Sequence, residues 1–102
     1  MELAERFHHG VAVVEIKDKE LSHADCHDFQ HQALDIFERQ NPHSLAVNLK
    51  NVDFLDSMGI GTLITLRNRL LKDGGTVALC ELNDNVKRVV NVASLHKVFS
   101  IY

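Results

Sequence analysis

Short β-forming segments alternate with longer segments of helical periodicity, and this alternation constrains the fold more than any other feature of the 102-residue sequence. Strand–helix–strand order builds a sheet whose neighbouring strands are parallel and are joined by helical crossovers. The first two expected strands, Leu3–Phe7 and Val11–Ile16, are joined only by a turn near His9-Gly10, so they should pair as a hairpin. The sequence therefore predicts an α/β fold, a small mixed sheet of about four to five strands with alternating helices.

Two further strands and a C-terminal segment complete the expected sheet. Apolar residues alternate in Ser44–Leu49, which indicates a buried strand, and Thr76–Leu82 is a second apolar segment. A connection around Pro42 precedes the first of these strands. The last apolar positions indicate a terminal strand or tail, and they are Val98, Phe99 and Ile101.

Three helices are expected between these strands. The first has Ser22 as its N-cap candidate and ends near Arg39, with an apolar face formed by Phe29, Ala33, Ile36 and Phe37. The second starts near Ser57 and stops at Gly74-Gly75, with a broad face formed by Ile60, Leu63, Ile64, Leu66, Leu70 and Leu71. The third is capped by Asn83 or Asp84 and carries Val86, Val89, Val90 and Ala93.

Length, charge and cysteine usage favour one cytoplasmic domain, residues 1–102. Acidic residues number 14 and basic residues 11, and the basic residues are scattered, so direct DNA or RNA binding is not expected. No apolar run approaches the roughly 20 residues that span a bilayer, so no membrane insertion is expected. Cys26 and Cys80 are far apart and form no paired motif, and the N-terminus lacks the features of a signal peptide. These features predict a soluble protein of the reducing cytoplasm.

The most distinctive segment, residues 48–61, joins a predicted strand to a predicted helix and reads Asn-Leu-Lys-Asn-Val-Asp-Phe-Leu-Asp-Ser-Met-Gly-Ile-Gly. Ser57 lies at the expected start of the helix, where its hydroxyl would meet free backbone amides and the positive end of the helix dipole. Gly59 and Gly61 remove side chains from the first turn, so another protein's backbone can approach closely. Each glycine costs about 1 kcal/mol relative to alanine in a helix, so a reason for their presence is expected.

This segment resembles the signature of a known family. The resemblance is to the signature of STAS domains and, more closely, to that of the anti-sigma factor antagonists. It lies in the run Asp56-Ser57-Met58-Gly59-Ile60-Gly61, which follows an apolar strand and Val52-Asp53-Phe54. The later runs Gly74–Cys80 and Asn83–Val90 are similar in kind to a second region of that family. The resemblance spans nearly the whole chain and is most specific at its centre.

The resemblance implies a switch function, because in that family the serine after the aspartate is phosphorylated by a partner-switching kinase. Carried over, Ser57 is the expected phosphorylation site, and the expected partner-binding surface is Asp56, Ser57, Met58, Gly59, Ile60 and Gly61. The implied partners are an anti-sigma factor or switch serine kinase, with other STAS proteins as further candidates. The implied fold, a small mixed sheet with helices around it, agrees with the pattern of elements.

Three positions depart from the family pattern. Lys19-Glu20-Leu21-Ser22 stands where the family commonly has Gly-Glu-Leu-Asp, in a region that often touches the kinase, so the resemblance does not identify the partner. Ser94 stands where many relatives have glycine. Met58 replaces a frequent second serine and leaves one hydroxyl at the expected site, which strengthens the choice of Ser57.

Two alternatives to a phosphorylation switch remain open. Ser57 can be an ordinary helix cap without a regulatory role. The chain can also be a non-phosphorylated STAS scaffold subunit of a signalling or transport complex.

Other site types receive less support. His23, His27 and His31 recur every four residues, a spacing that can hold a transition metal on one helix face, but no nearby cysteine or glutamate completes a ligand set, and a solvated stripe is the simpler interpretation. Residues 59–61 lack the further glycines and the Gly-Lys-Ser/Thr of nucleotide-binding loops. No spacing supports a Ser-His-Asp grouping. The sequence therefore predicts no catalytic residue, no cofactor and no metal site.

Overall fold

The computed structural model describes residues 1–21, 23–40 and 44–102, and side chains within helices and strands are described except those of His23 and Gln40. The strands are β1 (Leu3–His8), β2 (Val11–Ile16), β3 (Ser44–Asn48), β4 (Thr76–Cys80) and β5 (Ser100–Ile101). The helices are α1 (His23–Gln40), α2 (Ser57–Lys72) and α3 (Asp84–Val92), and a short 3-10 helix, η1 (Leu95–Lys97), precedes β5. The expected cap Ser22 and the connection at Pro42 lie outside the described residues.

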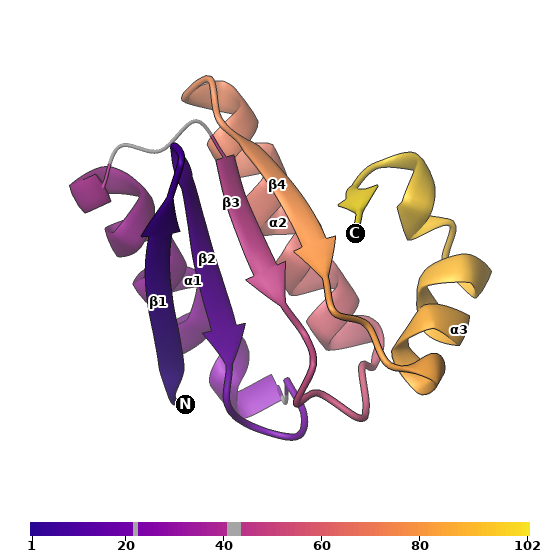
Figure 1. Cartoon of the computed structure of the whole chain (residues 1–102). Coiled ribbons are helices and arrows are strands. Elements are labelled where there is room, and N and C mark those ends of the chain that lie inside the picture. The colour runs from indigo at the N-terminus through magenta and orange to yellow at the C-terminus, as the bar shows by residue number, and fades with distance from the viewer. Residues whose placement is uncertain (22, 41–43) are drawn as a thin grey trace.

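The strands of the sheet lie in the order β1-β2-β3-β4-β5, and the sheet is mixed (Figure 1). β1 pairs antiparallel with β2, and the other pairs are parallel. The hairpin turn has His9 at φ 50° and Gly10 at φ 81°, which is the left-handed backbone that a tight two-residue hairpin loop requires. The helical crossovers between the parallel strands are α1 and α2, which confirms the predicted mixed α/β sheet.

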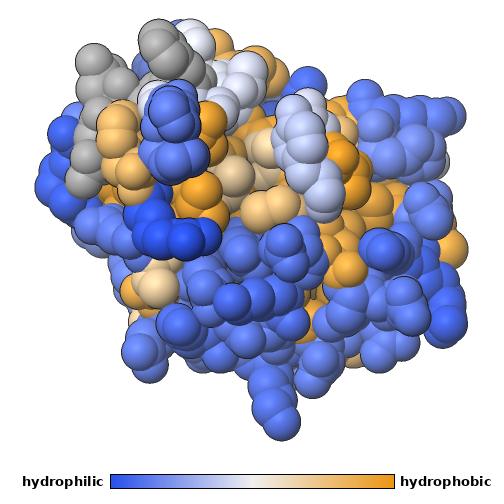
Figure 2. Space-filling model, in the orientation of Figure 1, coloured by the Kyte–Doolittle hydropathy of each residue, from blue (hydrophilic) through white to orange (hydrophobic). Residues whose placement is uncertain are grey.

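Only one face of the sheet is covered by helices α1 and α2, and the other face is turned toward the viewer in Figure 1. Alternate residues of β2, β3 and β4 pack into the core beneath the helices, and these are Ala12, Val14, Ile16, Leu45, Val47, Val77 and Leu79. Their neighbours on the uncovered face are half-buried and mostly small, as in Ala46 and Ala78. Figure 2, which shows this same side, has apolar surface in its upper part and hydrophilic residues across its lower part.

Helices α2 and α3 begin, and α2 ends, for local reasons. Asp56 is the N-cap of α2 and Asn83 the N-cap of α3, each with a side-chain oxygen that accepts from an amide of the first turn. At the other end of α2, Gly74 adopts a φ of 83°, a conformation that glycine reaches without steric cost. The apolar face of α2 packs on the sheet and includes Leu63, Leu66 and Leu70, all fully buried.

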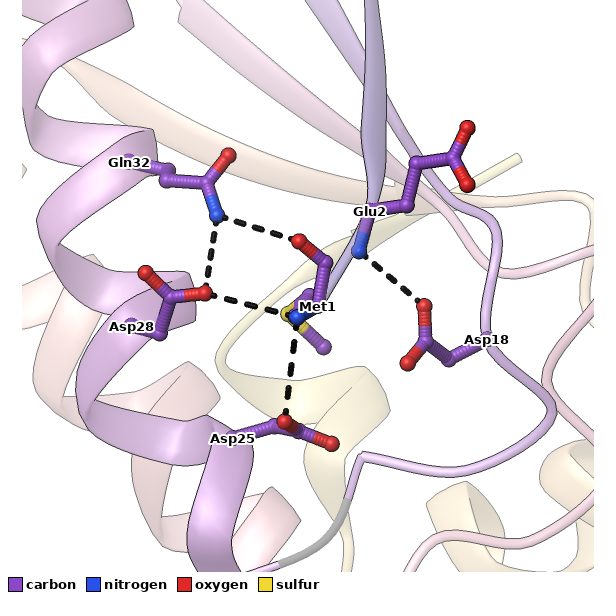
Figure 3. A network of polar contacts seen from close by, with 6 residues as sticks. All are labelled: Met1, Glu2, Asp18, Asp25, Asp28 and Gln32. Atoms are coloured by element: carbon purple, nitrogen blue, oxygen red, sulfur yellow. Dashed lines mark hydrogen bonds and ion pairs between the residues drawn. The ribbon is translucent and has the colours of Figure 1, made fainter.

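Polar contacts tie Met1, just before the edge strand β1, to α1 (Figure 3). The amino group of Met1 lies 3.9 Å from Asp25 Oδ1 and 3.6 Å from Asp28 Oδ2. Gln32 Nε2 donates to the Met1 carbonyl at 3.4 Å and to Asp28 Oδ2 at 3.0 Å. Pairs of this kind at the surface contribute about 0–1 kcal/mol each, so they hold the start of β1 in place more than they stabilise the fold.

The structure corrects several expected boundaries. β4 ends at Cys80 instead of Leu82, because Glu81 has a φ of 59° that ends the extended conformation. The C-terminal segment contains a 3-10 helix before a two-residue strand, where the sequence indicated only a strand or tail. Ser94 sits between α3 and that turn at φ 58° and ψ 30°, a left-handed conformation that suits glycine. No helix in the described part of the chain is both long enough and apolar enough to cross a bilayer.

Candidate functional site

The candidate site lies on the loop between β3 and α2, at the edge of the sheet where β2, β3 and β4 end. Because parallel strands end on the same edge, the loops that follow them meet there. The amide of Asp53 donates to the carbonyl of Lys19 at 2.7 Å, and Phe54 pairs with Glu20 in an isolated parallel bridge. The loop that carries the expected site is therefore fixed by the backbone of the loop that precedes α1.

Asn83 holds the same loop from the other side. Its side-chain Nδ2 donates to the carbonyl of Val52 and, at 3.5 Å, to Asp53 Oδ1. Its Oδ1 accepts from the amide of Val86 at 3.0 Å and thereby caps α3. One amide side chain thus links the β3–α2 loop to the start of α3.

Asn51 anchors the beginning of the loop to β2. Its Nδ2 donates to Glu15 Oε2 at 2.8 Å and to the carbonyl of Ile16 at 3.2 Å. Glu15 also pairs with Lys17 at 3.1 Å and Lys50 at 3.7 Å. The hydrogen bond from Lys17, followed by that from Asn51, lowers the pKa of Glu15 below its ordinary value. The carboxylate therefore stays charged and continues to bind Asn51, Lys17 and Lys50.

Asp56 and Ser57 have different roles at the start of α2. Asp56 Oδ1 accepts from the amide of Gly59 at 2.9 Å, and the Asp56 carbonyl accepts from Ile60 at 2.9 Å. Ser57 is the first residue of the helix and is exposed. The interpretation of Ser57 as the helix cap is therefore wrong, because Asp56 already provides the capping oxygen. No described residue hydrogen-bonds to the Ser57 hydroxyl, and the residue lies on the surface.

The remaining expected site residues divide between the surface and the interior. Met58 and Gly61 are exposed, and Phe54, which is not among the expected site residues, is 58% exposed in the loop before α2. Ile60 is half-buried and packs against the core. Gly59 is buried, and an added Cβ there would lie 2.7 Å from Leu55 Cδ1. A side chain at position 59 would thus crowd residues inside the chain, whereas position 61 faces open space.

A groove of about 370 Å³ lies between α1 and α2 beside Ser57. Both helices start at this edge of the sheet, and Cys26 Sγ on α1 lies 3.7 Å from the carbonyl of Met58 on α2. The residues that line the groove are Cys26, His27, Gln30, Ser57, Met58, Gly61, Thr62 and Thr65. The two threonine hydroxyls donate within α2, Thr62 to the Met58 carbonyl at 2.8 Å and Thr65 to the Gly61 carbonyl at 2.9 Å.

The histidine stripe does not form a metal site within the described structure. His27 and His31 are exposed on α1, and the side chain of His23 lies outside the described residues. Among the residues that the structure describes, no three His, Cys, Asp or Glu side chains come close enough to hold a metal ion. Within the described residues neither Cys26 nor Cys80 forms a disulfide, and burial raises the pKa of Cys80 with a smaller contribution from the charge of Glu81.

The contacts that position the site are not evident from the sequence. Asn83 was expected only to cap α3, and its donation to the Val52 carbonyl was not foreseen. A signal was available, since a polar residue that follows one parallel strand lies beside the loop that follows the next. The hydrogen bond from the Asp53 amide to the Lys19 carbonyl cannot be predicted from residue types, because every residue has a main-chain carbonyl.

Comparison with known proteins agrees with this geometry. Residues 3–102 match the STAS domain. The chain is 30% identical over 95 residues to the anti-sigma F factor antagonist of Paenibacillus polymyxa, an alignment that covers 93% of this chain and 80% of that protein.

Solved structures share the fold. An anti-sigma factor antagonist from Mycobacterium paratuberculosis superposes with a TM-score of 0.83 at 23% identity, over 99% of this chain and 84% of the other. The phosphorylated form of the Bacillus cell fate determinant SpoIIAA superposes with a TM-score of 0.70 at 15% identity, over 99% of this chain and 91% of the other. The chain therefore belongs to the STAS domain family and is of the anti-sigma factor antagonist type.

Proposed function

We propose that this chain is a regulatory protein that binds a partner-switching kinase or anti-sigma factor and is released when Ser57 is phosphorylated. The observation that carries the proposal is the exposed Ser57 hydroxyl, which no described residue engages, at the first turn of α2. In this proposal residues 1–102 act as one STAS domain in the cytoplasm, where kinases of this kind and their ATP are found. The names of the relatives support a partner of this class.

Exposed apolar side chains around Ser57 support the proposed docking surface. Phe54 is 58% exposed and Met58 is 45% exposed, and both lie within three residues of Ser57. Aromatic and methionine side chains are enriched in protein interfaces, where their burial supplies much of the binding energy. Gly61 adds a position without a side chain, so a partner's backbone can approach α2 there.

Phosphorylation would act on this surface rather than on the fold. The kinase would transfer the γ-phosphoryl group of ATP to Ser57 Oγ, with release of ADP and transfer of the hydroxyl proton to a base of the kinase. The phosphate adds a charge of about −1.5 to −2, and the amides and dipole at a helix N-terminus accommodate such a charge. At a docked interface the same charge would face Asp56 and the nucleotide of the kinase, and like charges in contact cost several kcal/mol. Each 1.4 kcal/mol or so weakens binding tenfold, which is enough to release the partner.

The proposal is tested with the cognate kinase, encoded beside this chain or captured with it. Incubation of the wild type with kinase and ATP should add one phosphate by intact mass, mapped to Ser57, and Ser57→Ala should gain none. Binding of the unmodified protein, Ser57→Ala, Ser57→Asp and protein carrying phosphoserine at 57 is then measured by calorimetry. We expect the first two to bind and the last two to bind at least tenfold more weakly.

A matched pair of variants tests the docking surface. Met58 and Leu71 are each 45% exposed on α2, but Leu71 lies at the far end of the helix from Ser57. Met58→Ala should weaken partner binding and Leu71→Ala should not. Equal binding by all phosphorylation variants would reject the switch and favour the alternative, a scaffold subunit whose Ser57 stays unmodified.

A further inference from the structure

The groove between α1 and α2 contains polar side chains that the proposed docking surface does not use. His27 and Gln30 on α1 line it opposite Ser57 and Met58 on α2. The two helices pack against each other, and both begin at the same edge of the sheet (Figure 1). A group attached to Ser57 Oγ therefore has the first turns of two helices beside it.

The hydrogen-bonding state of the groove favours a ligand that only accepts. No described residue hydrogen-bonds to the imidazole of His27 or to the side-chain amide of Gln30, so both have donors available. The hydroxyls of Thr62 and Thr65, by contrast, already donate to backbone carbonyls. A phosphate group carries acceptor oxygens and no donor at neutral pH, so it matches His27 and Gln30.

The charges around the groove single out His27. The residues that α2 contributes to the lining carry no titratable side chain, and the carboxylate of the cap Asp56 directly precedes Ser57 in the chain. On α1, the titratable neighbours of His27 are Cys26 in the groove, Asp28 beside it and His31 one turn further on, while the His23 side chain lies outside the described residues. His27 is thus the one described lining residue that can supply a positive charge.

We infer that phosphoserine at position 57 is bound within the α1–α2 groove, with the His27 imidazolium as its cationic partner and Gln30 as a second donor. The inference rests on the proposed phosphorylation of Ser57. The bound phosphate links α1 to α2.

The test uses protein with phosphoserine placed at position 57 by genetic code expansion, so that no kinase is needed. The midpoint of the second phosphate ionisation is measured by ³¹P NMR in the wild-type background and in His27→Ala, His27→Arg and His31→Ala. A neighbouring cation favours the dianion and lowers this midpoint. His31 serves as the matched control, because it is an exposed histidine on the same helix that does not line the groove.

We expect His27→Ala to raise the midpoint by about half a unit or more, His27→Arg to keep it low, and His31→Ala to leave it unchanged. Equal midpoints in the wild type and His27→Ala, or an equal rise in His31→Ala, would overturn the inference. Neither result bears on partner release, which the binding measurements with the same phosphorylated protein decide separately. All of these positions are exposed, and circular dichroism of each variant confirms that it is folded.

Discussion

Alanine at each of the two first-turn glycines of α2 separates internal packing from partner access. A Cβ at position 59 would lie 2.7 Å from Leu55 Cδ1 and 3.3 Å from the Leu21 carbonyl oxygen, whereas a Cβ at position 61 would meet nothing within 4 Å. Leu55 is 2% exposed and Leu21 is 1% exposed, so neither can move into solvent. Two substitutions of the same chemistry, two residues apart, should therefore have different effects on stability.

The magnitudes follow from two competing contributions. Replacing glycine with alanine inside a helix stabilises it by about 1 kcal/mol. At Gly61 this gain stands alone, so Gly61→Ala should raise the free energy of unfolding by about 0.5–1 kcal/mol. At Gly59 the overpacking costs about 1–3 kcal/mol, so Gly59→Ala should be between neutral and about 2 kcal/mol less stable than the wild type. The two variants should differ by about 1–3 kcal/mol.

Urea unfolding followed by far-ultraviolet circular dichroism measures this difference, provided that the dependence on urea concentration is the same for both variants. In a chain of this length a difference of about 1 kcal/mol also shifts the melting temperature by about 4–8 °C. Gly61→Ala should at the same time weaken binding of the proposed partner, because its methyl group stands on the exposed side of α2. If Gly59→Ala and Gly61→Ala prove equally stable, the contact with Leu55 is not the reason for glycine at position 59.

Three further changes test contacts that position the site. Asn83→Ala removes both the cap of α3 and the donor to the Val52 carbonyl, and should lower the free energy of unfolding by about 1–3 kcal/mol in denaturant titrations, whereas the loss of a simple cap would stay near 1 kcal/mol. Ser94→Gly should raise the free energy of unfolding by up to about 1 kcal/mol in denaturant titrations, because Ser94 holds a left-handed conformation at φ 58° that glycine adopts without steric cost. A lower free energy of unfolding would contradict this. The pKa of Glu15 is lower in the folded state than its ordinary value of 4.5, so its carboxylate contributes fully to the free energy of unfolding above pH 4.5. That contribution is lost as the pH falls through the lower pKa of the folded state. Glu15→Gln should therefore be less stable than the wild type at pH 7, with the gap closing in acid; a gap that stays constant with pH would refute the assignment.

The fold could be predicted from the sequence because its signals are local and agree with one another. The alternation in Val11–Ile16 and Ser44–Leu49, the helical spacing after Ser57, and the cap at Asn83 each indicate an element, and their order indicates the sheet. The errors lie at the ends of elements. Glu81 ends β4 through its backbone conformation, and neither its residue type nor the apolar Leu82 that follows signals a break.

The candidate site could be predicted only in part, because its key distinctions depend on contacts distant in sequence. Asp56 and Ser57 are both good helix caps by residue type, and only the geometry of the first turn assigns the cap to Asp56 and leaves the Ser57 hydroxyl available. Gly59 and Gly61 look equivalent in the sequence. Their difference arises because the side chain of Leu55 and, from the loop before α1, the main chain of Leu21 pack against Gly59, whereas nothing lies within 4 Å of a Cβ at position 61.

The way the β3–α2 loop is held has a consequence for divergence among related proteins. Its backbone is fixed from outside, by the main chain of Lys19 and the amide of Asn83, while Phe54 and Met58 project into solvent. Substitution at those two exposed positions changes the surface that a kinase encounters and leaves the location of the serine hydroxyl unchanged. Duplicated copies of such a chain can therefore diverge to bind different kinases within one cell while the fold stays the same.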